Sequence, residues 1–279
     1  MKRKEARGTC PVCGYKNAYT ETIARNGKRL GWCASCQDKE AIAAYLRGAY
    51  GAIHHAPGLS VSIAQERAER AAKAKERAWV IWAGAENITS GDPAWKYLNS
   101  RGIWDTDLGT PGFRYRADCP HPDGKRYPAL IAMLLDAWGR PQGIHRTFLS
   151  LDGKKAKLET TKASLGNMWG SSIWIRWPAS TPREIVIAEG LESAISAAFL
   201  LGLPACSAIS AGNMASGLVL SPAIESVIIA ADNDKPGLVA AETAAQRWKT
   251  EGRAVRILKG PPGQDFNDVL QGQQGQKAI

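Results

Sequence analysis

The chain has 279 residues, a length typical of about two domains. Because 44% of them are hydrophobic, the chain can bury a core, and a wholly disordered protein is excluded. The net charge of +10 favours a polyanionic partner, either nucleic acid or an anionic membrane surface. The charge is uneven, because residues 183–279 carry 8 basic and 10 acidic side chains, whereas residues 1–182 hold an excess of +12.

No segment has the pattern of a membrane anchor. The N-terminus lacks the apolar run of a secretory signal. Residues 193–224 contain no charged side chain, but Pro204, Gly212 and Pro222 interrupt them, which is typical of buried α/β structure rather than of a membrane-spanning helix. We therefore expect a soluble, cytoplasmic protein that does not bind a membrane.

Two C-x2-C motifs near the N-terminus predict a structural zinc site. They are nineteen residues apart, a spacing typical of four-thiolate sites, whereas a disulfide framework is not expected in a reducing compartment. The four expected ligands are Cys10, Cys13, Cys33 and Cys36. Residues 15–23 and 28–32 are expected to form strands around an Asn-Gly turn at 26–27, which makes the module a zinc ribbon. Chance spacing is the alternative.

The ribbon has two possible roles. A module of under about 50 residues needs a metal for stability, so the ribbon can be purely structural. However, residues 1–48 hold ten basic against four acidic side chains, with aromatic residues such as Trp32 among them. Cations interleaved with aromatic rings suit the exposed bases of single-stranded nucleic acid. We expect Trp32 to contribute to such binding.

The next segments organise the chain. Residues 54–60 have the composition of a linker, and the Ala-, Glu-, Arg- and Lys-rich residues 62–86 predict a long helix with a solvated charged face. A second helix is expected from Pro93, with Asp92 as its N-cap and Gly102 at its end.

Residues 127–178 have the pattern of β-structure. Two apolar segments flank a Trp-Gly-Arg-Pro turn and predict a hairpin, and two further apolar segments follow a charged turn. Arg146 and Lys162 place cations among these strands, where a charge is costly unless it is solvated or paired with an anion. Both are therefore candidates for phosphate contacts, with a surface role as the alternative.

Strands and helices alternate over the last third of the chain. Residues 184–188, 226–231 and 254–259 are apolar strands, and helices follow the first two. Such alternation with few charges in the strands predicts a parallel sheet covered on both faces. Ligands bind such sheets at the carboxyl ends of the strands.

Carboxylates gather at those strand ends. Glu189 follows the first strand, Asp232 and Asp234 follow the second, and Asp265 and Asp268 follow the third. Hard oxygen ligands at one rim are typical of a Mg²⁺ site. Any single acid of this kind can instead cap a helix, and this alternative is strongest for Asp265.

The motifs resemble the Toprim domain, which bacterial and phage primases share with type IA and type II topoisomerases and recombination mediators. The resemblance rests on AEGLESAISA, SAGNMASGL, AADNDKPG and QDFNDVL, and is closest to the variant of mobile-element primases. It implies Glu189, Asp232 and Asp234 as the catalytic set for Mg²⁺ or Mn²⁺, with Glu192, Asp265 and Asp268 as weaker supporting acids. KASLG resembles the basic segment before Toprim in primases, which implies Lys162 as a phosphate contact. Ser193 stands where replicative primases have a further acid.

The resemblance implies a DNA primase that synthesises short RNA primers from NTPs on a single-stranded DNA template. No GxxxxGK[ST] motif occurs, so we expect a separate replicative helicase as partner. Two alternatives stay open, namely a non-catalytic recombination-mediator-like DNA-binding protein and a Toprim nuclease. The expected fold is an α/β Toprim domain with a Rossmann-like parallel sheet at 183–279, preceded by a zinc ribbon at 1–48, a linker and charged helix at 49–90, and a basic α+β region at 91–182.

Overall fold

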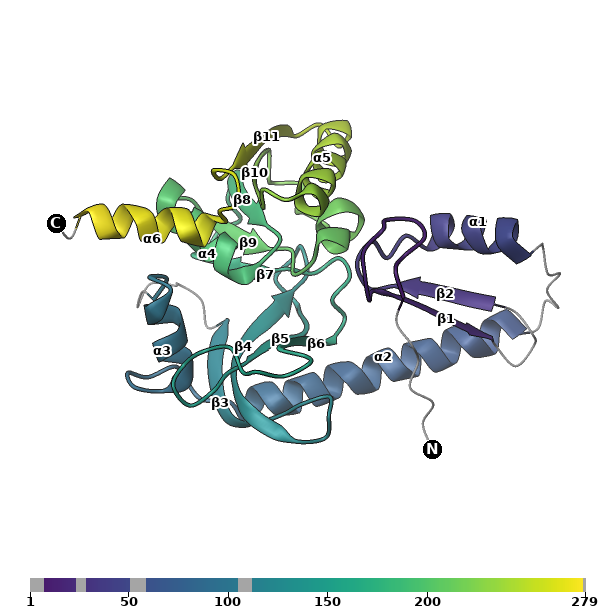
Figure 1. The fold of residues 1–279 in the computed structure, drawn as a ribbon, viewed down its shortest axis with the longest axis horizontal. Coiled ribbons are helices and arrows are strands. Elements are labelled where there is room, and N and C mark those ends of the chain that lie inside the picture. Colours follow the sequence, from purple (N-terminus) through teal and green to yellow (C-terminus); the bar gives the residue numbers. More distant parts are fainter. Residues whose placement is uncertain (1–7, 24–28, 51–58, 105–111, 278–279) are drawn as a thin grey trace.

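The computed structural model describes residues 8–23, 29–50, 59–104 and 112–277. Figure 1 shows a small N-terminal module beside a larger body of two sheets, with one long helix running between them. Within the described ranges, no helix is both long enough and apolar enough to cross a membrane.

The N-terminal module is a two-stranded antiparallel hairpin with one helix. Strands β1 (Tyr19–Ile23) and β2 (Arg29–Cys33) pair in register, and helix α1 (Lys39–Tyr50) packs on them. The core contains few apolar side chains, chiefly Ile42, Leu46 and two of the cysteines. A core of this size needs a staple, as expected for a ribbon. The predicted Asn-Gly turn lies outside the described residues, as does most of the predicted linker.

Two helices lead to the first sheet. Helix α2 (Leu59–Ala83) is the predicted charged helix, and α3 (Pro93–Ser100) begins as predicted. The Asp92 side chain accepts a hydrogen bond from the Trp95 N–H at 2.7 Å, and proline occupies the first turn, where no backbone donor is lost.

The first sheet is four-stranded and antiparallel, in the order β3-β4-β5-β6. The strands are β3 (Phe113–Pro120), β4 (Arg126–Leu135), β5 (Pro141–Phe148) and β6 (Lys162–Gly166). The predicted hairpin is β4–β5, whereas β3 is a strand that the sequence patterns did not reveal. Alternate residues of β4 face two different cores, one shared with α2 and one shared with the C-terminal region. Strand β4 therefore joins the two halves of the body.

The second sheet is five-stranded, in the order β11-β10-β8-β9-β7. Its strands are β7 (Ile173–Ile175), β8 (Glu184–Ala188), β9 (Ala205–Ser207), β10 (Ser226–Ala231) and β11 (Ala254–Lys259). All but β7 are parallel to their neighbours. The predicted parallel sheet is thus confirmed, with one short antiparallel strand at its edge. That strand belongs to this sheet rather than to the preceding one.

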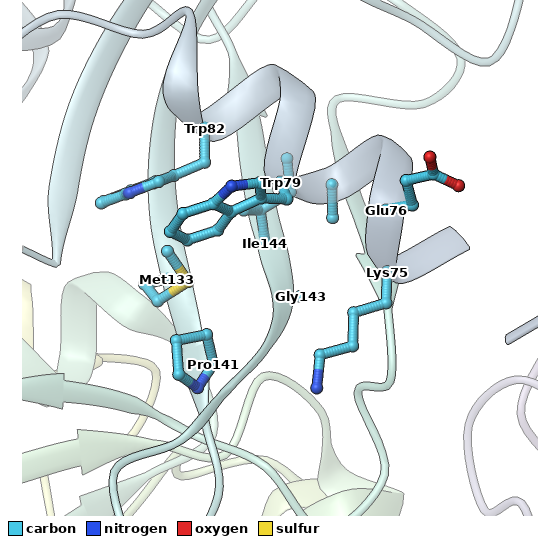
Figure 2. Close-up of a pocket in the computed structure, with 9 residues that line it drawn as sticks. Lys75, Glu76, Trp79, Trp82, Met133, Pro141, Gly143 and Ile144 are labelled. Atoms are coloured by element: carbon cyan, nitrogen blue, oxygen red, sulfur yellow. The ribbon is translucent and has the colours of Figure 1, made fainter. Parts of the chain in front are cut away.

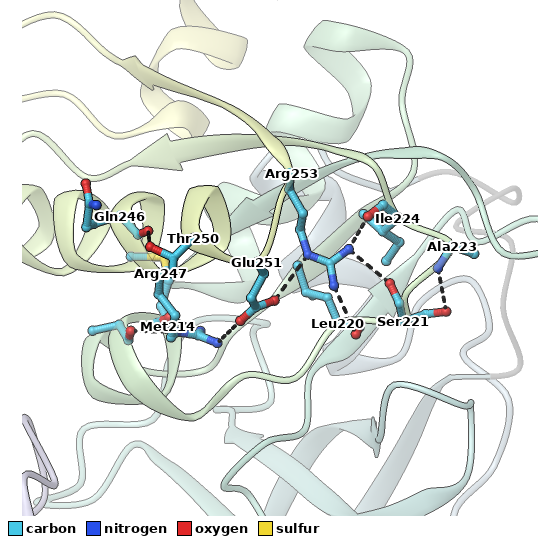
Figure 3. A network of polar contacts seen from close by, with 11 residues as sticks. Met214, Leu220, Ser221, Ala223, Ile224, Gln246, Arg247, Thr250, Glu251 and Arg253 are labelled. Carbon is cyan, nitrogen blue, oxygen red and sulfur yellow. Dashed lines mark hydrogen bonds and ion pairs between the residues drawn. The ribbon is translucent and has the colours of Figure 1, made fainter.

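Helices cover both faces of this sheet, as predicted. Helices α4 (Leu191–Leu201) and α6 (Phe266–Lys277) share one core, and α5 (Lys235–Thr250) shares the other with a π-helical turn, η1 (Asn213–Gly217). Figure 3 shows how two arginines fix η1 and the loop after it to the end of α5. Arg247 donates to the carbonyls of Met214 and Ala215, and Arg253 to those of Ser221 and Ile224. These bonds hold η1, and the residues just before it, Ser210 and Ala211, line the site described next.

Candidate active site and metal centre

The four thiols of the two C-x2-C motifs converge on one point. Their sulfur atoms all lie within 4.8 Å of one another, with Cys10 Sγ 3.9 Å from Cys36 Sγ and Cys13 Sγ 3.8 Å from Cys33 Sγ. Four sulfurs at about 2.3 Å from a tetrahedral zinc would lie about 3.8 Å apart, so the geometry fits this ion. Gly14 has φ 73°, the left-handed turn that the first knuckle requires. Cys119 and Cys206 are buried elsewhere.

The main acidic set lies at the carboxyl ends of two adjacent parallel strands. Strands β8 and β10 pair with Ala188 beside Ala230, so Glu189 and Asp232 emerge at the same edge of the sheet. Together with Asp234 they line a cavity of about 300 Å³. Among the residues that the structure describes, the four thiols are the only group of potential ligands close enough together to hold a metal ion as they stand. The arrangement of the acids suits a cation that keeps several waters, as Mg²⁺ does.

The acids repel one another and are poorly solvated. Burial, together with the charges of Asp232 and Asp234, raises the pKa of Glu189 from its ordinary 4.5 to about 7. Burial also raises the pKa of Asp232, and the charges of Asp265 and Asp234 add to the shift. Ser193 partly offsets this, because its hydroxyl donates to Asp232 Oδ1 at 3.2 Å. An uncompensated negative charge of this kind is what a bound divalent cation would neutralise.

Asp234 also has a structural role. It is the N-cap of α5, and its Oδ1 accepts a hydrogen bond from the Gly237 N–H at 2.7 Å. Gly237 permits this turn, because a Cβ there would lie 2.7 Å from the carbonyl oxygen of Asp232. A carboxylate has two oxygens, so capping leaves Oδ2 for another ligand.

Asp265 and Asp268 form a reciprocal cap at the start of α6. The Asp268 N–H donates to Asp265 Oδ1 at 2.9 Å, and the Asp265 N–H donates to Asp268 Oδ2 at 3.1 Å. This geometry corresponds to the capping alternative. Asp265 nevertheless lies close enough for its charge to raise the pKa of Asp232.

Glu192 forms ion pairs with two lysines of the preceding region. Its Oε1 lies 2.9 Å from Lys155 Nζ, its Oε2 lies 2.9 Å from Lys162 Nζ, and the Tyr97 hydroxyl donates to Oε1. These donors hold the Glu192 carboxylate in place, and the supporting metal role that the resemblance implies for it stays a prediction. Lys162 lies at the beginning of β6, beside this carboxylate and near Glu189. The positive charge of Lys162 partly offsets the rise in the pKa of Glu189.

The two other predicted binding residues lie apart from these lysines. Arg146 is buried in β5, where its guanidinium donates to the carbonyls of Pro120 at 2.7 Å and Ala163 at 3.4 Å. These contacts give it a role in holding the first sheet together. Trp32 is 40% exposed on the ribbon strand β2.

The ribbon lies directly over the acidic edge, the sheet edge that carries Glu189, Asp232 and Asp234. Tyr15, Asn17 and Ser35 of the ribbon line the same 300 Å³ cavity as the acids, and a larger cavity of about 900 Å³ continues between the ribbon and α5. The closest approach is at Gly212, where a Cβ would lie only 2.0 Å from the Ser35 carbonyl oxygen. The acids therefore face a cleft whose opposite wall is the zinc module.

A separate hollow lies on the outer side of the first sheet (Figure 2). It has a volume of about 250 Å³, and Trp79 and Trp82 of α2 line it together with Met133 and Ile144. It adjoins Gly143 at the beginning of β5, whereas Lys162 pairs with Thr147 near the end of that strand. The residues that line this hollow include neither the acids of the cleft nor Lys155 and Lys162.

Three residues of the site were missed by sequence reasoning: Tyr97, Lys155 and Ser193 in its hydrogen-bonding role. One signal was available, because Glu192 is the sole charged residue of the apolar segment 191–201. An acid on a buried helix needs a cationic partner. Its partners lie 30 to 95 positions away in the chain, so the pattern alone could not name them.

Two family models match this chain, one over the first sheet with the helices before it and one over the C-terminal sheet. Residues 184–276 match the family model of the Toprim domain, and residues 72–175 match a domain of unknown function, DUF7146. The resemblance to the Toprim family is thereby confirmed, and the C-terminal sheet with its acids is a Toprim domain. No curated protein matches the sequence.

Solved structures extend the likeness to the rest of the chain. A DNA primase domain from Pseudomonas aeruginosa aligns with a TM-score of 0.51 and 15% identity, over 74% of this chain and 77% of that one. The zinc-binding and RNA polymerase domains of the Aquifex aeolicus primase align with a TM-score of 0.51 and 13% identity, over 95% of this chain and 78% of that one. At these identities the fold is shared, and the activity has to be argued from the site.

Proposed function

We propose that the protein is a DNA primase, a nucleotidyltransferase that makes short RNA primers on single-stranded DNA. One observation carries the proposal: the zinc ribbon and the Toprim carboxylates face each other across one cleft. A purely DNA-binding mediator has no use for clustered carboxylates that repel phosphate. A nuclease would use similar acids but has no need for a template-binding module over them.

The carboxylates Glu189, Asp232 and Asp234 would hold Mg²⁺ or Mn²⁺. Such an ion, when bound, neutralises the triphosphate of the incoming nucleotide and the charge that develops in an in-line displacement. Asp232 is positioned by the Ser193 hydroxyl and Asp234 by the start of α5. Glu189, with its pKa raised to about 7, can act either as a ligand or as the group that accepts a proton.

The ribbon would bind the template. Tyr15 and Trp32 are 49% and 40% exposed, and both belong to the basic region of the chain. Exposed aromatic rings among cations stack on unpaired bases, and cations bind the backbone. The zinc would be structural, and NTPs and single-stranded DNA would meet in the cleft below it. Such an enzyme would work in the cytoplasm beside a separate helicase, which the described domains do not include.

The test is primer synthesis. The full chain is incubated with single-stranded DNA of varied sequence, labelled NTPs and Mg²⁺, and the products are separated by length. Oligoribonucleotides that depend on template and metal support the proposal. Shortened DNA would identify a nuclease, and binding without any product would identify a mediator. The exposed substitution Glu242→Gln on α5 serves as the matched control for substitutions of the acids.

A further inference from the structure

The outer hollow, the cavity of about 250 Å³ between α2 and the first sheet, has no part in the proposed chemistry. Its inner wall is fixed, because Trp82, Met133 and Ile144 belong to one buried core. The guanidinium of Arg114 also stacks over the Trp82 ring, 4.5 Å from its centre. Trp79, three residues earlier on α2, is 56% exposed and forms the open wall (Figure 2). The hollow is thus preformed on one side and open to solvent on the other.

A second exposed tryptophan lies on the turn that borders the hollow. Pro141 lines the hollow, and Trp138 of the same turn is 65% exposed. The turn is firmly held, because the Asp136 carboxylate accepts hydrogen bonds from the backbone N–H groups of Trp138 and Arg140, both at 3.0 Å. The guanidinium of Arg140 lies 5.0 Å from the centre of the Trp138 ring. Tryptophan and arginine are the side chains that contribute most to binding energy at protein interfaces.

The rim of the hollow is positively charged. Lys75 is exposed, and its Nζ lies 3.5 Å from the side-chain oxygen of Gln142. Arg140 binds Asp136, but its side chain is largely exposed, whereas that of Asp136 is largely covered. Glu76 is an exposed acid at the rim, and Figure 2 shows its carboxylate directed away from the two tryptophans. A partner of complementary charge therefore carries carboxylates that can meet Lys75 and Arg140.

The lining favours a protein side chain over a nucleobase. Met133, Pro141 and Ile144 offer no partner to the polar edge of a base, and burying such an edge unpaired is unfavourable. The position of the hollow agrees, because Met133 packs in the core shared with α2, whereas Leu134 packs in the core shared with the Toprim domain. Successive residues of a strand face opposite sides of a sheet. A partner in the outer hollow therefore leaves the catalytic cleft free.

We propose that the outer hollow is a docking site for an acidic segment of another protein that carries one large apolar side chain. The apolar side chain would fill the space between Trp79 and the inner wall, and neighbouring carboxylates would pair with Lys75 and Arg140. Nucleic acid and a second copy of this chain are the competing occupants. The inference does not depend on primer synthesis, because the hollow contains none of the proposed catalytic residues.

The first experiment measures the binding of a defined peptide to the full chain. The probe is a short fluorescein-labelled peptide of aspartate, serine and glycine with one phenylalanine at its centre. Two further versions have alanine in place of phenylalanine, or lysine in place of every aspartate. We expect saturable fluorescence anisotropy with the first peptide and affinities weaker by about tenfold for the other two, because anchor and charge both contribute. Equal affinities of the three peptides, or no binding of the first, would overturn the proposal.

Variants with matched controls locate the binding site. Trp79→Ala and Lys75→Glu should each weaken binding of the acidic peptide by about tenfold. Lys73→Glu is the charge control, because Lys73 is exposed and two positions along a helix correspond to about 200° around its axis. Leu151→Ala is the apolar control, since Leu151 is 75% exposed in the loop between β5 and β6. Controls that weaken binding as much as the variants would refute the site. If Trp79→Ala does not fold, Lys75→Glu carries the test, because an exposed lysine is replaced.

NMR separates the possible occupants. The acidic peptide should shift the indole N–H signals of Trp79 and Trp82 and leave that of Trp248, which is buried in the Toprim domain, unchanged. An oligothymidine that displaces the peptide and shifts the same two signals would identify a nucleic-acid surface instead. Self-association of the wild type in sedimentation, together with a monomeric Trp79→Ala, would identify a second copy as the occupant. Either of these last two results overturns the proposal.

Discussion

The four thiols of the ribbon and the carboxylates of the Toprim domain differ in how they are arranged. In the ribbon, four thiols surround one point with spacings that match the ideal geometry of a single ion. At the Toprim edge, three carboxylates line a cavity, and burial and their mutual repulsion raise the pKa values of Glu189 and Asp232. A closed set of ligands stabilises a fold, whereas an open set leaves room for water and substrate. The four thiols therefore fit a structural ion, whereas the carboxylates fit the catalytic ion that we propose.

Removing zinc should have the largest effect on structure. Cys33→Ser, or a strong chelator, is expected to unfold residues 8–50, because the core of this module has only Ala18, Tyr19, Ile42 and Leu46 besides its cysteines. Binding of a structural zinc contributes about 10–16 kcal/mol in small zinc modules. Elemental analysis should find about one zinc per chain in the wild type and none in the variant. Proteolysis should then cleave the ribbon and leave the Toprim core intact. Simultaneous unfolding of both regions would show that they do not fold independently.

Asp232→Asn should have the largest effect on activity. The substitution removes a proposed metal ligand, so Mg²⁺-dependent primer synthesis should fall by about 10²-fold or more. Affinity for single-stranded DNA should stay unchanged or increase slightly, because a negative charge has been removed near a phosphate path. Asp268→Asn is the comparison, and its effect should be milder because the Asp268 carboxylate caps the start of α6. Retention of near-wild-type synthesis by Asp232→Asn would contradict a catalytic role for the acidic edge.

Glu189→Gln should reveal the repulsion at this edge. The pKa of Glu189 is raised from 4.5 to about 7, so between these values the folded state binds more protons than the unfolded one, and stability falls as pH rises. Glu189→Gln has no group that ionises at this position, so it does not lose stability in this way as pH rises. Without divalent metal, its free energy of unfolding at pH 8 should exceed that of the wild type by about 1–3 kcal/mol. Denaturant titrations at pH 5 and pH 8 measure the difference.

Added Mg²⁺ should reduce that difference, because the cation compensates the charge that Gln lacks. Glu242→Gln, an exposed change on α5, keeps Glu189, so the difference between its free energy of unfolding and that of the wild type should not grow from pH 5 to pH 8. A variant less stable than wild type at pH 8 would mean that the carboxylate is held by favourable contacts instead.

The sequence predicted those parts of the molecule that depend on local patterns. Cysteine spacing located the ribbon ligands, and the apolar strands before Glu189 and Asp232 located the acidic edge. Both features depend on neighbours in the chain. The edge of the Toprim sheet did not follow in this way, because β7 has only three residues and its apolar pattern fits either sheet.

Contacts between segments that are distant in the chain could not be predicted from the sequence. Glu192 looked like a supporting acid because of its position beside the motif, yet its charge is used by lysines 30 and 37 residues earlier. Arg146 was a candidate phosphate contact, and in the structure two of its donors bind backbone carbonyls of the same sheet. In both cases burial and partners decide the role, and neither can be read from a single sequence.

The smallest expected change concerns the contact between the two regions. Gly212 has φ −64° and ψ −40°, which alanine adopts freely, so Gly212→Ala should leave the Toprim domain as stable as before or slightly more so. The added methyl group would nevertheless lie 2.0 Å from the Ser35 carbonyl oxygen, so the ribbon must move away. We expect faster hydrogen exchange in residues 33–38 and weaker primer synthesis, with zinc content unchanged. Gly48→Ala is the control, because a Cβ at that position meets nothing within 4 Å. If exchange in the ribbon stays the same, the two regions are not in contact in solution, and the acids work without the zinc module above them.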